Sequence, residues 1–116
     1  MTMTIASYTL TRAVVETVQN RWEVALPSLR RGHILYNLAV YLSVVARERA
    51  ENPATESEIA AHFKITERTL RRVCARLAAD VRADPKNFLP VLVNLLVDEA
   101  CARAGLTSKG RFYHVR

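Results

Sequence analysis

The sequence predicts an all-α fold, a bundle of five helices in one domain. Glycine and proline are scarce, with three and four residues among 116, whereas alanine, leucine and arginine, which favour helices, are plentiful. Half of the residues are hydrophobic, which is enough for one core in a chain of this length and is not typical of a disordered tail. No run of alternating β-branched residues bounded by turns is present, so we expect little sheet.

The first two helices are indicated by apolar residues at helical spacing. We expect a helix over residues 10–26, preceded by a flexible leader over 1–9 and ended by Pro27, which cannot continue a helix. Its apolar stripe consists of residues four apart: Leu10, Val14, Val18 and Trp22. A second helix, expected over 33–50, is apolar around more than half of its circumference. Such a helix belongs at the centre of a bundle, packed on several sides.

The third and fourth helices are short and follow each other closely. Thr55 to Glu58 reads T-x-x-E, a capping box that predicts the start of the third helix. This helix is expected to end near Phe63. Thr66 is placed to cap a fourth helix over residues 67–80.

The fifth helix is expected to begin near Asn87, with Pro90 tolerated in its first turn, and to end at Gly105. Its expected apolar face consists of Phe88, Leu89, Leu92, Leu95, Leu96 and Ala100. The five helices thus form a single domain over residues 10–105, and residues 106–116 form a basic tail.

The third and fourth helices together fit the pattern of a DNA-binding helix-turn-helix over residues 56–80. Such a pair needs apolar residues at fixed offsets, because two short helices lock at a steep angle over a small shared core. Those offsets are all filled, by Ile59, Ala60, Phe63, Ile65, Leu70 and Val73. Lys64 occupies a turn position where glycine is usual, because this position often needs positive φ. Either the lysine adopts that geometry at some cost, or the turn is slightly open.

The outer side of the fourth helix is basic, and Glu67 is its only acidic residue between Lys64 and Arg76. In helix-turn-helix modules the N-terminal half of the second helix contacts base edges. Arginine pairs there with guanine, and threonine meets a thymine methyl group or a phosphate. The candidate DNA-binding residues are Lys64, Thr66, Arg68, Thr69, Arg71, Arg72 and Arg76.

Among these candidates, we expect Arg68, Arg71 and Arg72 to point outward together and to contact bases or nearby phosphates. A net charge of +6 favours a polyanionic partner, here double-stranded DNA. Two alternatives stay open. The domain can be a protein-docking module whose basic face meets an acidic protein, or a protein that coats DNA without sequence preference.

Metal, cofactor and membrane functions find no support in the sequence. Cys74 and Cys101 are isolated, no His/Cys spacing suits zinc, and no cofactor is expected. We interpret Cys74 as a packing residue. Residues 1–8 do not resemble a signal peptide, and the longest apolar stretch, residues 35–46, is too short and too polar to span a bilayer. The expected location is the cytoplasm, in association with the nucleoid.

Catalysis finds no support either, so the protein is not expected to be an enzyme. The three histidines, among them His62, lie far apart in sequence and have no partner in register. Asp98 and Glu99 are adjacent, so on a helix they point in different directions and cannot act as one carboxylate pair. Tyr36, Tyr41 and Trp22 are interpreted as core or groove-lining residues.

Residues 32–77, GHILYNLAVYLSVVARERAENPATESEIAAHFKITERTLRRVCARL, resemble the cyclin-like repeat of archaeal transcription factor B and eukaryotic transcription factor IIB. The counterparts of the family's buried helix, its "EIA" helix and the helix after it are NLAVYLSVVA, SEIAAHF and ITERTLRRVCARL. DPKNFLPVLVNLL is similar to the segment that leads from one repeat to the next. The likeness extends loosely over residues 10–110 and is best over 32–90.

This resemblance implies a cyclin-like five-helix bundle that contains a promoter-reading helix-turn-helix, with Thr66, Thr69, Arg71 and Arg72 at the matching positions. The family has two full repeats and an N-terminal zinc ribbon, whereas this chain has room for one repeat and a fragment and lacks the cysteines of the ribbon. The resemblance therefore implies a single-repeat transcriptional regulator of an archaeon, a virus or a plasmid. A homodimer that restores two DNA-reading modules, and contact with the transcription machinery, are the partners it suggests besides DNA.

Overall fold

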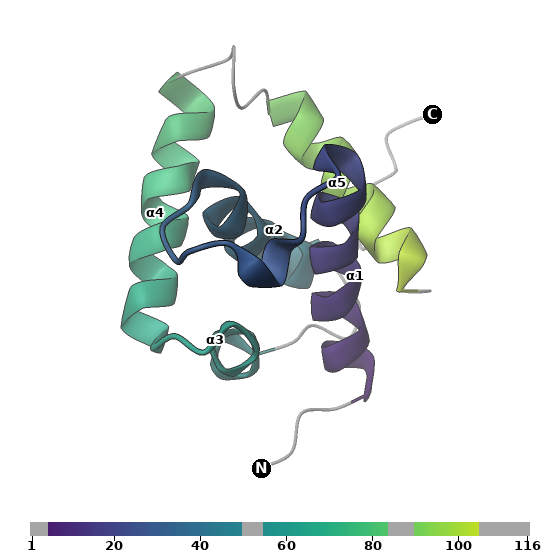
Figure 1. Cartoon of the computed structure of the whole chain (residues 1–116), viewed down its shortest axis with the longest axis horizontal. Coiled ribbons are helices and arrows are strands. Elements are labelled where there is room, and N and C mark those ends of the chain that lie inside the picture. The colour runs from purple at the N-terminus through teal and green to yellow at the C-terminus, as the bar shows by residue number, and fades with distance from the viewer. Residues whose placement is uncertain (1–4, 50–54, 84–89, 105–116) are drawn as a thin grey trace.

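The computed structural model describes residues 5–49, 55–83 and 90–104. These residues form five α-helices and one short 3-10 helix, and they contain no β-strand (Figure 1). In chain order the elements are α1 (Ile5–Trp22), η1 (Leu26–Ser28), α2 (Ile34–Arg49), α3 (Glu56–Phe63), α4 (Glu67–Ala83) and α5 (Pro90–Arg103). The prediction of an all-α bundle with five helices is confirmed.

The helix α2 is the centre of the bundle, as its apolar circumference predicts. It contacts α1, α3, α4 and α5, and Figure 1 shows α4 on one side of it and α1 with α5 on the other. Its fully buried apolar residues are Leu38, Ala39, Val40, Leu42 and Ala46. Ser43 is buried among them, and its hydroxyl donates to the Ala39 carbonyl oxygen at 2.9 Å. That hydrogen bond removes the cost of burying a polar group at the centre of the core.

The first helix begins at Ile5, five residues before the expected start. The expected start at residue 10 is therefore wrong, and α1 includes residues 5–9 of the expected leader, while 1–4 lie outside the described residues. The physical reason is that residues 5–9 contain neither proline nor glycine, so nothing in the backbone stops the helix there. Val14 and Val18 of the expected stripe are completely buried, and Trp22 packs against the core.

The same helix ends at Trp22, so the expected end at residue 26, before Pro27, is wrong as well. Glu23 adopts a left-handed conformation with φ of 52°. The N–H of Val24 then donates to the Gln19 carbonyl oxygen at 3.2 Å, the six-to-one hydrogen bond of a Schellman motif. The chain passes from there through η1 to the start of α2.

The boundaries of α4 and α5 differ little from the expected ones. The end of α4 lies three residues beyond residue 80. Pro90 is the first residue of α5, where its missing N–H leaves no hydrogen bond unmade. Residues 84–89, including the expected start at Asn87, and the expected end at Gly105 lie outside the described residues.

The predicted inner face of α5 is only partly right. Leu96 and Ala100 are buried, but Leu95 is 56% exposed. The residues that face α1 and α2 are Val93, Leu96, Val97, Ala100 and Cys101. The segment from residue 91 to 97 is apolar on both sides of the helix, so its periodicity alone does not choose between the two faces. Despite this apolar character, no helix within the described ranges is both long and apolar enough to cross a membrane.

Candidate nucleic-acid interface

The start of α3 is fixed by the capping box that the sequence predicts. The Thr55 hydroxyl oxygen accepts from the Glu58 N–H at 3.1 Å. The Glu58 carboxylate in turn accepts from the Thr55 N–H at 3.0 Å. Both donors would otherwise be unsatisfied at the helix start, so a helix of only eight residues begins at a defined position.

The turn between α3 and α4 is left-handed, with Lys64 at φ 59° and ψ 44°. The Lys64 N–H donates to the Ala61 carbonyl oxygen at 3.1 Å, and the Ile65 N–H donates to the Ala60 carbonyl oxygen at 3.0 Å. This pair of hydrogen bonds is a Schellman motif. Of the two geometries left open for Lys64, the turn adopts the one with positive φ. A lysine there costs roughly 1–2 kcal/mol relative to right-handed backbone.

Thr66 caps α4, as predicted. Its hydroxyl oxygen accepts from the Thr69 N–H at 3.0 Å, and its hydroxyl also lies 3.0 Å from that of Thr69. Thr66 is exposed and Thr69 is half-buried. The primary role of these two candidate residues is therefore to begin the helix, and they present a hydroxyl pair at its N-terminal end.

The shared core of α3 and α4 is built from the six predicted residues. Ile59, Ala60, Phe63 and Leu70 are buried. Ile65 and Val73 are partly buried and pack against the same core. Because this core also includes residues of α2, the orientation of α4 relative to the bundle is fixed by packing.

The outward face of α4 carries three arginines at intervals of four residues. Leu70, Leu77 and Val81 face the core. On the opposite side lie Arg68, Arg72 and Arg76, which we call the arginine row; all three are exposed. The small residues Ala75 and Ala79 are exposed between them.

No carboxylate among the described residues lies within 4.0 Å of a nitrogen atom of the arginine row. Like charges four residues apart on a helix destabilise it by a few tenths of a kcal/mol per pair. The row contains two such pairs, Arg68 with Arg72 and Arg72 with Arg76. Its charge therefore does not serve the stability of α4, and it is available to an anion.

Arg71 differs from the arginine row. Its guanidinium lies 3.3 Å from a carboxylate oxygen of Glu56 on α3 and 3.8 Å from one of Glu67. Successive helix residues are about 100° apart around the axis, which directs Arg71 toward α3 rather than along the row. The Arg71 side chain remains 60% exposed, and ion pairs this exposed contribute at most about 1 kcal/mol.

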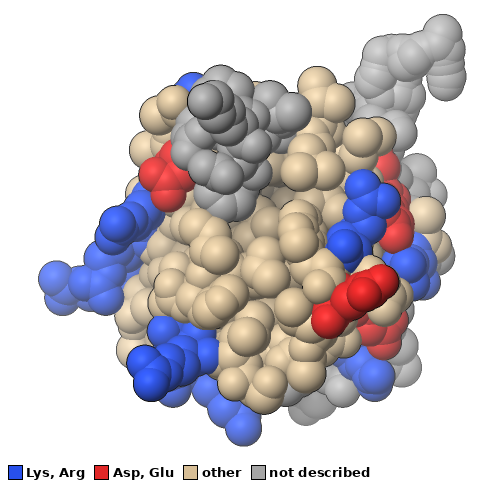
Figure 2. All heavy atoms as spheres, turned by 45° about the horizontal axis from the view of Figure 1, so that its top comes forward, with Lys and Arg blue, Asp and Glu red and all other residues tan. Residues whose placement is uncertain are grey.

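Basic side chains lie along the edge of the molecule that α4 forms, and others lie beside acidic side chains on the opposite edge (Figure 2). Figure 2 shows Lys and Arg side chains along the left edge, where Figure 1 places α4, while mostly uncharged side chains cover the middle of that face. The structure thus brings three candidate residues together in the row and places Thr66 and Thr69 at the helix start. Lys64, in the turn before Thr66, lies outside the row.

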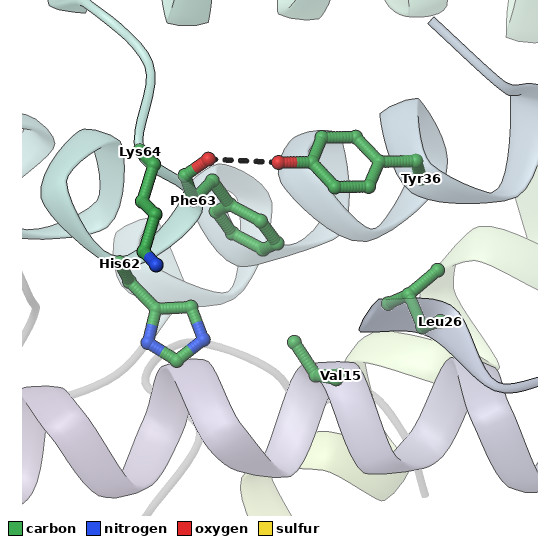
Figure 3. A pocket seen from close by; sticks show the side chains of 6 residues that line it. All are labelled: Val15, Leu26, Tyr36, His62, Phe63 and Lys64. Carbon is green, nitrogen blue, oxygen red and sulfur yellow. Dashed lines mark hydrogen bonds between the residues drawn. The ribbon is translucent and has the colours of Figure 1, made fainter. Parts of the chain in front are cut away.

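Lys64 lines a cleft of about 220 Å³ between α1, η1, α2 and the end of α3. The other lining residues are Val15, Leu26, Tyr36, His62 and Phe63 (Figure 3). The Tyr36 hydroxyl donates to the Phe63 carbonyl oxygen at 2.7 Å, and the two rings meet edge to face with centroids 5.7 Å apart. The interpretation of Tyr36 as a core or groove-lining residue is confirmed.

Burial shifts the pKa of both titratable rings in the cleft away from the charged form. The pKa of Tyr36 is raised by burial, an effect that the nearby Arg31 charge opposes. The pKa of His62 is lowered by burial and by the charge of Arg12. Both rings are therefore favoured in their neutral forms.

The environment of Cys74 agrees with its interpretation as a packing residue. It packs against the core, and burial, aided by the charges of Glu56 and Glu48, raises the pKa of its thiol to about 12. A thiol with so high a pKa is a poor nucleophile at neutral pH. Within the described parts of the chain, no group of three His, Cys, Asp or Glu residues could hold a metal ion.

A scan against protein-family models, a search of curated proteins and a search of solved structures each found no match to the chain. The likeness to transcription factor B and transcription factor IIB therefore stays a prediction that rests on the quoted sequence segments.

Proposed function

We propose that the protein is a DNA-binding transcriptional regulator that inserts α4 into the major groove of double-stranded DNA. The observation that carries this proposal is the arginine row: three exposed arginines without a carboxylate partner among the described residues, on a helix whose orientation is fixed by the core. A net charge of +6 adds attraction to DNA at long range.

The shape of the outer face of α4 supports the same partner. An α-helix with its side chains is about 10–12 Å wide, close to the width of the major groove. Ala75 and Ala79 leave the backbone open to close approach between the arginines. Arg68, in the first turn of α4, is placed for base edges, where a bidentate arginine contact with guanine is worth about 1–3 kcal/mol of discrimination. Arg72 and Arg76 continue the row toward the phosphates.

The remaining candidate residues would contribute at the start of α4. The Thr66 and Thr69 hydroxyls lie beside free N–H groups at a helix N-terminus, a position that suits a DNA phosphate. Arg71 would reach DNA only by leaving Glu56, which costs little at this exposure. A homodimer and contact with the transcription machinery belong to this proposal as implications of the resemblance, and association with the nucleoid belongs to it as a consequence of DNA binding.

A protein-docking module is the second candidate function, and one surface favours it. Val91 and Leu95 lie one turn apart on α5 and are 66% and 56% exposed. Adjacent exposed apolar residues are typical of surfaces that meet another protein. This function predicts partner binding that is unaffected when the arginine row is removed.

The test of DNA recognition is selection of bound duplexes from a random pool, with the wild type and with Arg68→Ala/Arg72→Ala. The matched control is Arg21→Ala/Arg30→Ala, which removes the same charge from exposed residues outside α4. We expect a motif from the wild type and the control, and its loss or change in the row variant. A motif that survives the row variant unchanged would contradict the proposal. Binding without any motif would indicate a protein that coats DNA.

A further inference from the structure

The cleft beside the α3–α4 turn has the dimensions of a site for a small molecule. Its volume of about 220 Å³ corresponds to roughly seven water molecules at their liquid volume. Its walls come from four elements and include Val15 of α1, Leu26 of η1 and Phe63 of α3. Leu26 and Phe63 are buried, so this part of the wall belongs to the hydrophobic core. An apolar body of the size of one ring fits such a space.

The polar groups of the cleft select the charge of an occupant. The Tyr36 hydroxyl proton is already engaged, because it is donated to the Phe63 carbonyl oxygen. The Lys64 ammonium has no carboxylate within 4.0 Å among the described residues. Figure 3 shows the Lys64 side chain extending along the rim of the cleft toward the His62 ring. The group that remains available to a bound molecule at this end of the cleft is therefore the positively charged Lys64 ammonium.

Two further cations act on the cleft from neighbouring segments. The Arg12 charge reaches His62, and the Arg31 charge reaches Tyr36. Arg12 is partly compensated by Glu16, at 3.6 Å. A cleft with apolar side chains in its wall and cations at its rim favours an organic anion, because apolar groups bind the body and the positive charges attract the carboxylate.

The conformation of Lys64 supports a binding role for its side chain. Glycine would take the left-handed turn without strain, whereas lysine holds it at φ 59°. Backbone strain that is retained at one position is often associated with the function of the side chain it presents. Here that side chain lies on the rim of the cleft and outside the arginine row.

We propose that this cleft binds a small monocarboxylate with an aromatic or branched aliphatic body, with the body between Val15, Leu26 and Phe63 and the carboxylate on the Lys64 ammonium. Because Lys64 is the turn residue between α3 and α4, occupancy also ties the first-turn end of α4 to the rest of the bundle. The expected change in DNA affinity on occupancy rests on the proposed function, whereas binding of the carboxylate does not.

In the test, benzoate or isovalerate is titrated into the full chain without DNA. The amide chemical shifts are monitored during the titration by two-dimensional NMR. Benzamide, which is neutral and has nearly the same shape as benzoate, is the ligand control. We expect saturable shifts at Val15, Tyr36 and His62 with the carboxylates and at least tenfold weaker binding of benzamide. Equal binding of benzamide, or no saturation below about 10 mM carboxylate, would overturn the proposal.

Two variants locate the site. Lys64→Gln removes the charge but keeps a long side chain, and it should weaken benzoate binding roughly tenfold. Val15→Phe fills the cleft and should abolish binding. Arg21→Gln, an exposed cation outside the cleft, should leave binding unchanged. If Val15→Phe does not fold, Lys64→Gln decides: unchanged binding in this variant, or shifts confined to the arginine row, would contradict the proposed site.

A DNA titration with and without saturating benzoate separates the two proposals. If the wild type binds DNA, benzoate should change its DNA affinity but not that of Val15→Phe. If the wild type does not bind DNA, the proposed function fails, and the cleft proposal still stands or falls on the NMR shifts. An identical benzoate effect on wild-type and Val15→Phe DNA binding would show that the anion acts outside the cleft.

Discussion

The helices α4 and α5 lie on opposite sides of α2 (Figure 1), and their outward faces differ in kind. The outward face of α4 carries Arg68, Arg72 and Arg76, whereas that of α5 carries the exposed apolar residues Val91 and Leu95. Both helices bury apolar residues on their inner faces. The inner faces of the two helices thus hold the bundle together, and their outer faces are free to differ. This separation predicts which substitutions change stability and which change binding alone.

The largest expected effect comes from the inner face of α4. Leu70 is 1% exposed and lies in the core shared with α3, so Leu70→Ala should lower the free energy of unfolding by about 2–5 kcal/mol. Leu95→Ala, on the outer face of α5, should change it by less than about 0.5 kcal/mol. Urea unfolding of both variants measures the difference. Losses of equal size would remove the distinction between inner and outer faces.

A smaller loss is expected at the start of α4. Thr66→Ala removes the oxygen that accepts from the Thr69 N–H, and it should lower the free energy of unfolding by about 1 kcal/mol. Thr66→Ser keeps a capping hydroxyl and is the matched control, with an expected change of only a few tenths of a kcal/mol. Thermal or urea unfolding distinguishes them. A Ser variant that is as unstable as the Ala variant would show that the cap is not the cause.

A substitution in the turn before α4 is expected to raise the free energy of unfolding instead of lowering it. Lys64→Gly relieves the left-handed strain and should raise the free energy of unfolding by about 1 kcal/mol relative to Lys64→Ala, which keeps the strain. Both variants lack the ammonium, so both should weaken benzoate binding at the cleft roughly tenfold, as Lys64→Gln does. Urea unfolding compares their stability. If the glycine variant were no more stable than the alanine variant, the turn would not store the strain assigned to it.

The lowered pKa of His62 predicts that the stability of the protein depends on pH. Its pKa in the folded protein lies below the ordinary 6.5, through burial first and the Arg12 charge second. The unfolded chain therefore binds a proton more readily, and stability should fall as the pH decreases from above 6.5 through the lowered folded pKa. His62→Gln should flatten this part of the profile. Urea midpoints measured across this pH range test it, and parallel profiles for the two proteins would exclude His62 as the cause.

The sequence predicts the α3–α4 pair better than it predicts α5, and the reason is physical. The capping box at Thr55 and the cap at Thr66 are local signals, and α4 separates leucines from arginines around its circumference. The segment 91–97 is apolar on both sides, so only its packing against α1 and α2 decides that Val93 is buried and Leu95 exposed.

Two further features have no clear signal in the sequence. Glu23 ends α1 in a left-handed conformation that residues other than glycine seldom adopt. Nothing in the sequence therefore indicates that the helix ends there, and Pro27 is the nearest residue of a kind known to end helices. The cleft draws its walls from α1, η1, α2 and α3, and no local pattern predicts which residues of four separate segments meet. Tyr36 and Lys64 were recognisable individually, but not as neighbours.

The arginine row is the claim on which the proposed function depends, and the salt dependence of DNA affinity tests it most directly. For each phosphate contact, the logarithm of the association constant falls by about 0.9 per unit of log salt concentration. If Arg72 and Arg76 each meet a phosphate, Arg72→Ala/Arg76→Ala should reduce the steepness of this dependence by about 1.8 without lowering stability. Arg21→Ala/Arg30→Ala should leave it nearly unchanged. Equal slopes for the wild type and the row variant would contradict binding of DNA through α4.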